Sequence, residues 1–436
     1  MSARFNTLQD WLDWQETLHP TEIELGLERV AAVFKRMHSS HVFPCPVITL
    51  AGTNGKGSSL RMLESTYLAD GYRVGAYSSP HLLRYNERIR VNGEEVTDEE
   101  IAAAFERIDA ARAEISLTYF EFGTLAALDI FMLPSLDVVL LEVGLGGRLD
   151  AVNIIDADVA LLTAIGLDHT EWLGHDREAI GFEKAGILRR GHPVVCSDAD
   201  VPRSIIQHAA NLGSPLHCLG KEFDFEIKPD GWCWHLHAGK MRDLPHPCLR
   251  GVHQYRNAAG VMMVLECLQA RLPVSAAAMR SGLLDACLPG RFQAVTQLLA
   301  GQTAATVSWI YDVAHNPDSM LQLANMLATA EPPGRTRAVL GMLADKDSVS
   351  ALKHIHSYID DWYVISLDTP RSEKPEKLKD IILGLGATSV SLQTSAADAW
   401  TVLEKSAQAG DRIVVFGSFY TVSEVMAVAQ THGQRI

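Results

Sequence analysis

The sequence predicts an α/β protein with two parts: an N-terminal domain built on a mainly parallel, doubly wound sheet, and a C-terminal Rossmann-like α/β domain. Short apolar runs alternate with helical patterns over residues 47–200, and again from about residue 297. Strands that alternate with helices are typical of parallel sheets. Residues 222–240 differ, because their two-residue alternation around Asp230-Gly231 predicts a small antiparallel hairpin attached to the first domain.

Taken in order, the N-terminal domain is expected to hold strands at 46–50, 72–77, 137–141 and 159–163, with helices at 59–69, 99–112 and 119–133. The C-terminal domain is expected to hold strands at 308–312, 337–340, 362–365 and 412–416. The loop Leu288-Pro289-Gly290-Arg291 is the expected boundary region, which gives predicted domains at 1–292 and 293–436.

Composition excludes several classes of protein. The 436 residues carry 38 basic and 53 acidic side chains, a net charge of −15, which argues against nucleic acid as the main partner. No apolar run reaches the ~18 residues of a membrane span, and the N-terminus lacks an apolar signal core. Seven cysteines without C-x-x-C spacing predict neither a zinc site nor a disulfide framework, so we expect a cytoplasmic protein.

The strongest motif lies between the first strand and the first helix. It consists of Gly52, Thr53, Asn54, Gly55, Lys56, Gly57 and Ser58. Glycines let backbone N–H groups surround phosphate oxygens, and the lysine supplies a positive charge to the β- and γ-phosphates. The spacing departs from the common phosphate loop, because Leu50 replaces its first glycine and Gly57 replaces the hydroxyl residue that binds magnesium. The alternative is a glycine-rich turn with a chance lysine.

Glu142 follows strand 137–141, at the strand end where ligands of parallel sheets bind. Its carboxylate is a hard oxygen ligand suited to Mg²⁺. The glycines after it do not fit a dinucleotide-binding motif, because Leu149 occupies the place of the last glycine. His169 follows the next strand, and we interpret it as a metal ligand beside Glu142 on a neighbouring strand, although a lone histidine is more often structural.

These motifs resemble those of the Mur ligase/folylpolyglutamate synthase superfamily. The resemblance covers nearly the whole chain and includes 25–30, 52–59, 79–81, 116–121, 142–153, 167–170, 183–187, 257–259, 288–292, 312–317 and 417–419. It implies that Ser79 supplies the displaced magnesium-binding hydroxyl. It also implies that Lys184 of Glu183-Lys184-Ala185-Gly186-Ile187 is carbamylated and joins Glu142 and His169 around a second Mg²⁺.

The resemblance implies further binding residues. Asn257, Arg291 and Asp312 would hold ATP together with the phosphate loop, with the nucleotide between the domains. His315 and Ser418 would lie near the incoming glutamate, and His315 or Asp312 would act as the base. The expected pterin or folate site is Thr118, Tyr119, Phe120, Glu121, Leu149, Asp150 and Ala151. Each of these has a structural alternative, such as a helix cap or a loop residue.

The implied activity is Mg-ATP-dependent ligation of a carboxylate to an amine through an acyl phosphate. Residues 118–121 resemble the bacterial bifunctional type, which joins L-glutamate to 7,8-dihydropteroate and then extends the tail of reduced folates. One or two Mg²⁺ are expected, with K⁺ as a further candidate, and the chain is expected to be a monomer. The alternatives are a monofunctional synthase, a Mur-type cell-wall ligase and a non-catalytic P-loop switch.

Overall fold

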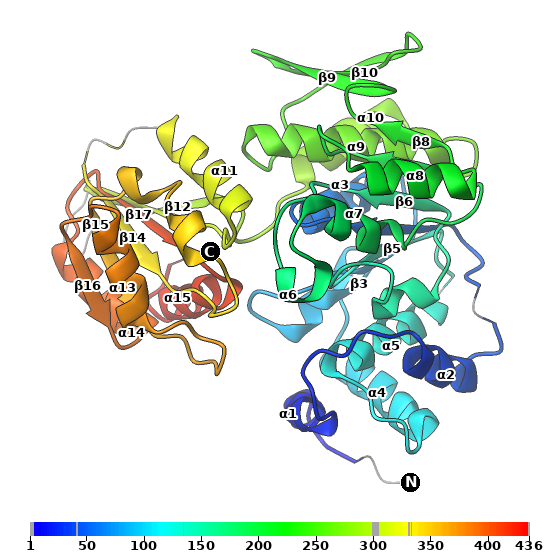
Figure 1. The fold of residues 1–436 in the computed structure, drawn as a ribbon, viewed down its shortest axis with the longest axis horizontal. Coiled ribbons are helices and arrows are strands. Elements are labelled where there is room, and N and C mark those ends of the chain that lie inside the picture. The colour runs from blue at the N-terminus through cyan, green and yellow to red at the C-terminus, as the bar shows by residue number, and fades with distance from the viewer. Residues whose placement is uncertain are drawn as a thin grey trace. The chain divides into compact units, whose positions relative to one another are not determined.

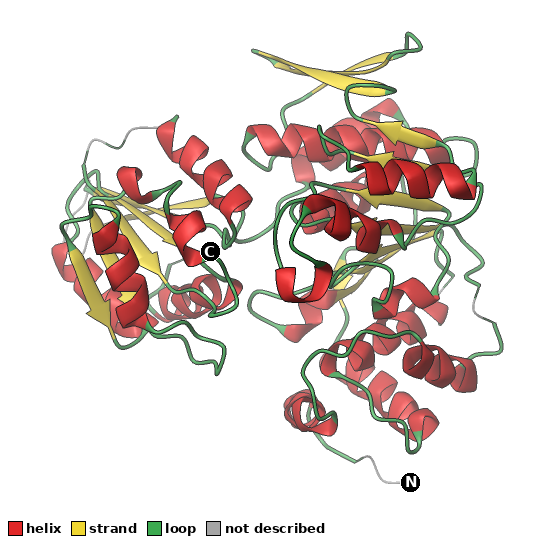
Figure 2. Ribbon diagram, viewed as in Figure 1, coloured by secondary structure: helices red, strands yellow, loops and turns green. Residues whose placement is uncertain are grey.

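The computed structural model describes residues 4–40, 42–133, 135–298, 305–329, 332 and 334–434. The chain divides into two compact units. Unit 1 consists of Met1–Gly166, Leu173–Cys248 and Val252–Cys287, whereas unit 2 consists of Leu167–Trp172, Leu249–Gly251 and Leu288–Ile436. Each unit is a sheet covered by helices (Figures 1 and 2). The division into domains at 1–292 and 293–436 remains a prediction.

The main sheet of unit 1 has eight strands. In spatial order they are β4 (Glu94–Glu95), β3 (Ile89–Val91), β2 (Val74–Tyr77), β5 (Val138–Glu142), β1 (Val47–Ala51), β6 (Val159–Leu162), β7 (Val194–Cys196) and β8 (Leu216–Cys218). The six strands from β2 to β8 are parallel, and β3 and β4 add an antiparallel edge. Because β1 and β5 are buried along their whole length, they consist almost entirely of apolar residues.

Helices cover both faces of this sheet (Figure 1). One group packs around the helix that follows the phosphate loop: α3 (Lys56–Ala69), α9 (Val252–Leu268) and α10 (Ala276–Asp285). The other helices of unit 1 are α1 (Leu8–Leu18), α2 (Glu28–Met37), α4 (Asp98–Arg112), α5 (Tyr119–Met132), α7 (Arg177–Ala185) and α8 (Arg203–Leu212), with the short η1 (Tyr85–Arg88) and η2 (Ala151–Ile154). Most of the short helix α6 (Thr170–Leu173) belongs by its contacts to unit 2. Apolar residues of α1, α2, α4, α5, α7 and α8 form one continuous core with the sheet.

A separate three-stranded antiparallel sheet belongs to unit 1. It consists of β9 (Phe223–Lys228), β10 (Gly231–Leu236) and β11 (Met241–Leu244), with β10 in the centre. The hairpin predicted for residues 222–240 is therefore confirmed, and β11 is an additional strand that the sequence pattern did not reveal. Trp232 and Trp234 of β10 are buried, which anchors the small sheet to the rest of the unit.

Unit 2 contains a six-stranded sheet in the order β12 (Gln293–Leu298), β13 (Thr306–Tyr311), β17 (Arg412–Phe416), β14 (Thr336–Leu340), β15 (Asp361–Ile365) and β16 (Val390–Gln393). Only β12 is antiparallel to its neighbour. Its helices are α11 (Pro317–Ala328), α12 (Ser348–Leu352), α13 (Pro375–Gly384), α14 (Ala396–Ser406), α15 (Phe419–Thr431) and the short η3 (His356–Tyr358). Helices α11, α12 and α13 share one core with a face of the sheet. On the other face, Trp400 of α14 stacks on Trp309 of β13 with 4.3 Å between ring centroids.

The predicted fold class is confirmed, since both sheets are mainly parallel and alternate with helices. One expectation about cysteines is wrong, because the structure joins Cys248 and Cys287 in a disulfide with 5.8 Å between their Cα atoms. These residues are 39 positions apart, and they meet because the end of α10 folds back onto the segment before α9, where Cys248 N–H donates to the Leu283 carbonyl at 3.0 Å. Sequence spacing carries no sign of this contact.

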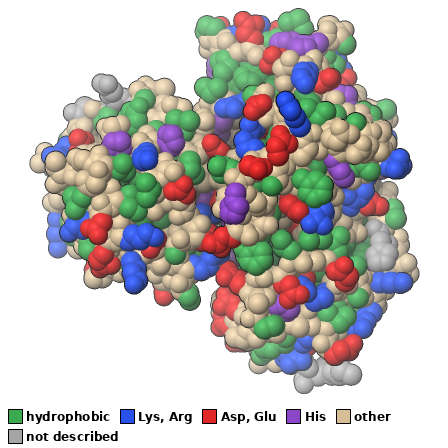
Figure 3. Space-filling model, viewed as in Figure 1, with side chains coloured by type: hydrophobic (Ala, Val, Ile, Leu, Met, Phe, Trp, Pro, Cys, Tyr) green, Lys and Arg blue, Asp and Glu red, His purple; other side chains and the backbone are tan. Residues whose placement is uncertain are grey.

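None of the helices in the described part of the chain combines the length and apolar character that a membrane span requires. On the face drawn in Figure 3, acidic and basic side chains are interspersed rather than gathered into a single basic block.

The helix after the phosphate loop is held by a buried ion pair. Glu64 of α3 is fully buried, and its carboxylate accepts hydrogen bonds from Arg90 at 2.9 Å and from Arg61 at 3.0 Å. Arg90 also donates to the Ser78 hydroxyl at 3.2 Å. The pair therefore links α3 to β3 and to the loop that follows β2.

We predict that Glu64→Ala lowers the free energy of unfolding by about 3 kcal/mol, because it leaves the largely buried Arg90 without its counter-charge. Urea denaturation measures this loss. The matched control is Glu99→Ala, which removes an exposed glutamate from α4 and should change stability by less than about 0.5 kcal/mol. Equal effects of the two substitutions would contradict the structural role of Glu64.

Candidate active site

The phosphate loop follows β1 and has almost no room for side chains. Gly55 has φ +94°, and a Cβ atom there would lie 2.4 Å from Asn257 Oδ1. A Cβ atom at Gly52 would lie 1.8 Å from the Thr163 hydroxyl. Thr53 is held by its N–H, which donates to the Ala164 carbonyl at 2.7 Å. Tertiary contacts with the segment after β6 and with α9 thus explain the glycines at these two positions.

Lys56 is the first residue of α3, and Gly57 and Ser58 follow it in the first turn of that helix. The Lys56 ammonium donates to the Gly52 carbonyl at 3.0 Å, so its side chain folds back over the loop. Asn54 lies opposite Ala164 in an isolated β-bridge. The loop and the helix N-terminus thus form the arrangement that binds phosphate groups in other proteins.

Asn257 reaches the phosphate loop from α9. Its amide group donates to Gln254 Oε1 at 2.9 Å, and Gln254 in turn donates to the Ser58 hydroxyl at 3.4 Å. The structure therefore brings this predicted ATP-binding residue next to Gly55, although 202 positions separate them in the sequence.

Ser79 comes two residues after β2, and Glu142 is the last residue of the neighbouring parallel strand β5. Tyr77 is paired with Leu141 in the β2–β5 register, so the two residues belong to the same end of the sheet. Glu142 is only 4 % exposed, and Ser79 is half-buried. A hydroxyl and a carboxylate are hard oxygen donors of the kind that Mg²⁺ prefers, so these residues fit such an ion.

Lys184 lies in the last turn of α7, and its side chain is buried. Its backbone packs against the loop after Glu142, since a Cβ atom at Gly147 would lie 3.1 Å from Lys184 Cα. In the same contact, Arg148 N–H donates to the Glu183 carbonyl at 2.8 Å, and the Arg148 guanidinium pairs with the Glu183 carboxylate at 2.9 Å. The predicted carbamylation site is thus fixed against the glycine-rich loop.

The expected position of His169 beside Glu142 needs correction. Strand β1 lies between β5 and β6, so the strands before these two residues are not neighbours. His169 comes after the end of β6 and belongs by its contacts to unit 2. There its Nε2 lies 3.3 Å from the Lys346 ammonium, and its backbone has φ +50°. Because a lysine only donates, this nitrogen acts as the acceptor, and metal binding would require its Nδ1 or the departure of Lys346.

Asp168 is the centre of a buried charge cluster in unit 2. Its carboxylate accepts from Lys346 at 2.7 Å and from the Asn316 amide at 3.2 Å, and lies 3.4 Å from His315 Nε2. Burial raises the pKa of Asp168, but the hydrogen bond and charge of His315 and the charge of Lys346 lower this pKa by more, so the carboxyl is held ionised. Burial, with Lys346 beside it, lowers the pKa of His169 to about 4, which keeps that imidazole neutral at pH 7.

Asp312 follows β13 and accepts backbone hydrogen bonds from Phe292 at 2.8 Å and Ala314 at 2.9 Å. Burial raises the pKa of Asp312, whereas the neighbouring Arg291 and these two N–H groups oppose the rise. The Arg291 guanidinium lies over the Phe419 ring at 5.2 Å. The structure therefore brings together the predicted Arg291 and Asp312 within unit 2.

His315 follows the same strand. Its Nδ1 lies 2.8 Å from the Val313 carbonyl, and its Nε2 faces Asp168. Both ring nitrogens of His315 therefore face oxygen acceptors. Ser418 lies at the end of the adjacent β17 and is buried as the N-cap of α15, where its hydroxyl accepts from Thr421 N–H at 3.0 Å.

The predicted pterin residues occupy two places in unit 1. Thr118 and Glu121 form a capping box at the start of α5, and Glu121 also pairs with Arg29 at 2.8 Å. Their polar groups therefore organise the helix start. The aromatic rings of Tyr119 and Phe120 lie beside Tyr85 and Tyr77, with centroid distances of 5.7 Å and 6.2 Å.

Asp150 is the N-cap of η2 and is 2 % exposed. Its carboxylate accepts from the backbone N–H groups of Leu145 at 2.9 Å and Val152 at 3.0 Å. Burial raises the pKa of Asp150 to about 6, while these N–H groups and the charge of Lys56 limit the rise. On either side, the Leu149 carbonyl accepts from Gly26 N–H at 3.2 Å, and Ala151 is buried.

Sequence reasoning did not assign roles to Lys346, Arg88 or His81. Arg88 lies over the rings of Tyr85 and Tyr119 at 5.2 Å and 5.5 Å and donates to His81 Nδ1 at 2.8 Å. Burial, with Arg88 adding to it, lowers the pKa of His81 to about 4. The Ser79-Pro80-His81 motif could have directed attention to this cluster, whereas Lys346 gave no signal beyond a charged loop.

Comparisons with known proteins agree with this geometry. The family described as "Mur ligase, glutamate ligase domain" matches residues 290–419, which places the C-terminal part among Mur-type ligases. Dihydrofolate synthase/folylpolyglutamate synthase of Escherichia coli is 44 % identical over 422 residues, covering 97 % of this chain and 95 % of the relative. The chain therefore belongs to the dihydrofolate synthase/folylpolyglutamate synthase family, and the predicted family resemblance is confirmed.

Solved structures extend the comparison. Escherichia coli FolC in complex with DHPP and ADP is 43 % identical, with a TM-score of 0.90 over 98 % of this chain and 99 % of that chain. A bifunctional folylpolyglutamate synthase/dihydrofolate synthase with Mn, AMPPNP and L-glutamate bound is 44 % identical, with a TM-score of 0.88 over 98 % of each chain.

The raised pKa of Asp150 leads to a prediction about stability and pH. As pH rises from about 4 to about 6, the unfolded chain releases this proton before the folded chain does, so the carboxyl makes folding less favourable. Asp150→Asn does not titrate. We expect the free energy of unfolding of this variant, minus that of the parent, to rise by about 2 kcal/mol from pH 4 to pH 7. Denaturant unfolding at each pH measures this difference. The control Asp230→Asn, at an exposed turn, should show no such trend.

Proposed function

We propose that this chain joins L-glutamate to 7,8-dihydropteroate, and also to reduced folate glutamates, by ATP-dependent formation of an acyl phosphate. The observation that carries the proposal is the set of groups at one end of the unit 1 sheet. Lys56 folds over the phosphate loop, Ser79 follows β2, and Glu142 ends the adjacent strand β5. Relatives with the same fold bind ADP or AMPPNP, as well as DHPP or L-glutamate.

Activation requires that the negative charge of the γ-phosphoryl group be neutralised while the substrate carboxylate attacks it. We assign the phosphate groups to the backbone N–H groups of residues 52–58 and to the Lys56 ammonium, and the ATP base or ribose to Asn257. Ser79 and Glu142 would hold Mg²⁺, which supplies Lewis-acid stabilisation of charge on the phosphoryl oxygens. Carbamylation of Lys184 would convert a buried cation into a further oxygen donor.

In unit 2, Arg291, Asp312, His315 and Ser418 would serve ATP and glutamate. Asp312 is the better base for the glutamate ammonium, because burial raises its pKa whereas both nitrogens of His315 already face oxygen acceptors. The buried hydroxyl of Ser418 would act by fixing the start of α15.

For the pterin, we propose the aromatic cluster of Tyr119, Phe120 and Tyr85 with the Arg88 guanidinium over it, together with residues 149–151. Aromatic faces stack on a flat heterocycle, and the carboxyl of Asp150 has a pKa of about 6 that lets it exchange a proton near neutral pH.

The direct test supplies the purified chain with Mg-ATP and L-glutamate. One reaction contains 7,8-dihydropteroate and the other a reduced folate monoglutamate, and mass spectrometry follows the products alongside ADP. We expect dihydrofolate in the first and a glutamate-extended folate in the second. Product in only one reaction would indicate a monofunctional synthase, and ADP without an amide would favour a different acceptor or a P-loop switch.

We predict that Lys56→Ala lowers kcat by at least about 10³-fold in both reactions, because it removes the charge that faces the transferred phosphoryl group. Lys353→Ala, at an exposed position after α12, is the matched control and should retain full activity. An unchanged rate in Lys56→Ala would overturn the assignment of the phosphate loop.

Gly55 in the phosphate loop and Gly71 after α3 both have positive φ, and comparing them gives a sharper test of the loop. Gly55→Ala places a methyl group 2.4 Å from Asn257, whereas Gly71→Ala, at φ +86°, meets nothing within 4 Å. Both positions have positive φ, so both substitutions strain the backbone. We expect only Gly55→Ala to weaken ADP binding, by more than about tenfold in calorimetry, because only it displaces the phosphate-binding backbone. Equal affinities would show that the contact with Asn257 is not needed.

A further inference from the structure

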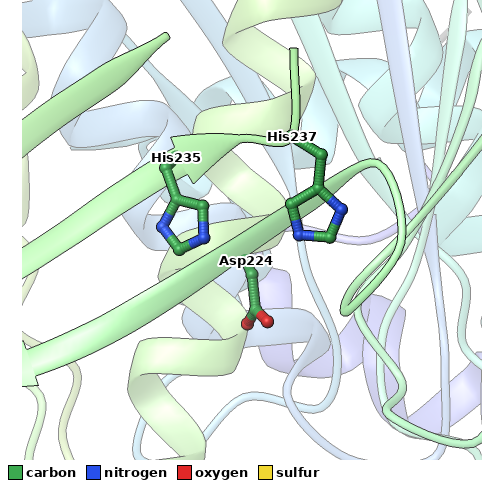
Figure 4. Close-up of side chains that lie close together, drawn as sticks. All are labelled: Asp224, His235 and His237. Atoms are coloured by element: carbon green, nitrogen blue, oxygen red, sulfur yellow. The ribbon is translucent and has the colours of Figure 1, made fainter. Parts of the chain in front are cut away.

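The small antiparallel sheet of unit 1 presents a cluster of side chains that the proposed ligase reaction does not use. His235 of β10 is paired with Asp224 of β9 in the strand register. His237 is the first residue after β10, in the turn that leads to β11. The strand pairing brings one imidazole opposite the carboxylate, and the turn adds the second imidazole close to both (Figure 4).

The three groups are close without being bonded to one another. One ligand atom from each of Asp224, His235 and His237 lies within 4.8 Å of the other two. The two rings stack with 5.9 Å between centroids and 29° between planes. Within the described part of the chain, neither imidazole makes a hydrogen bond to a protein group, and the Asp224 carboxylate accepts from Phe225 N–H at 2.8 Å.

We propose that Asp224, His235 and His237 bind a borderline divalent metal ion, of which Zn²⁺ is the physiological example. Two imidazole nitrogens and one carboxylate are a donor set that suits zinc, copper or nickel, whereas Mg²⁺ prefers oxygen alone. Atoms that share such an ion are about 3–4 Å apart, since each lies ~2 Å from the metal. Small side-chain rotations close the observed spacing, and water completes the coordination.

The surroundings favour a cation at this place. The neighbour of His235 on β11 is Met241, which carries no charge. Arg242 is paired with Trp234 instead, so its side chain leaves from the opposite face, where it approaches Glu266 at 3.5 Å. Asp224 and His235 are half-buried and His237 is exposed, which leaves the site open to an ion from solution. In Figure 3, histidine side chains gather on the surface over this sheet.

The hydrogen bond that Phe225 N–H donates to the Asp224 carboxylate supports the site. It fixes one oxygen of Asp224, in the way that outer hydrogen bonds orient metal-binding carboxylates. The hairpin itself is held by the buried Trp232 and Trp234 and does not need the ion in order to form. Removal of the metal is therefore expected to leave the fold of unit 1 intact.

The test uses the full chain without a histidine tag. Excess Mg²⁺ is present to occupy the site proposed at Ser79 and Glu142. Zn²⁺ binding is measured by competition with a chromophoric chelator, and Cu²⁺ serves as a spectroscopic probe. We expect one Zn²⁺ site whose affinity falls by at least about tenfold in His235→Ala and in His237→Ala, and by a smaller factor in Asp224→Asn. The nitrogen couplings in the Cu²⁺ paramagnetic resonance spectrum should weaken in both histidine variants.

The matched control is His354→Ala, which removes an exposed histidine of unit 2 and should leave both readings unchanged. Thermal unfolding without metal checks that each variant is folded, and the exposed His237 provides a variant that does not disturb the strand pairing. The proposal would be overturned if the parent chain bound no Zn²⁺. It would also be overturned if His235→Ala and His237→Ala bound Zn²⁺ as tightly as His354→Ala.

Discussion

The position of β1 in the centre of its sheet is the constraint on which the candidate site of unit 1 depends. A parallel strand buried on both faces must end in a loop at the same edge as its neighbours. The phosphate loop after β1 therefore lies between Glu142, which ends β5, and Thr163, which follows β6. Gly52 has no room for a Cβ atom because Thr163 is so near, whereas at Gly55 the obstacle is Asn257 of α9.

Three buried carboxyl groups have pKa values that their neighbours shift in different directions. Asp150 and Asp312 are each held by two backbone N–H groups and have raised pKa values, since burial outweighs those bonds. Asp168 has a lowered pKa, because His315 and Lys346 add positive charge beside it. The same residue type thus has a raised pKa at two positions and a lowered pKa at the third, and only the neighbours differ.

Much of the fold followed from sequence pattern. The apolar runs at 46–50, 137–141 and 412–416 are strands almost as predicted, and the Asp230-Gly231 turn marked a real hairpin. Short or half-exposed strands such as β11 and β16 lacked a clear pattern, and the Cys248–Cys287 pair joins positions with no local relation. The prediction that His169 lies on a strand next to that of Glu142 was wrong, because strand order in a sheet differs from strand order in the chain. In the sheet, β1 separates β5 from β6.

By itself, the sequence determined the class of fold, the phosphate loop and the family, since each of these depends on residues that are adjacent in the chain. Only the tertiary structure decided which distant groups meet. It placed Asn257 against Gly55, Lys346 against Asp168, and His235 with His237 opposite Asp224. It also set the burial and the hydrogen-bond partners that decide the pKa of Asp312, and neither can be read from a linear pattern.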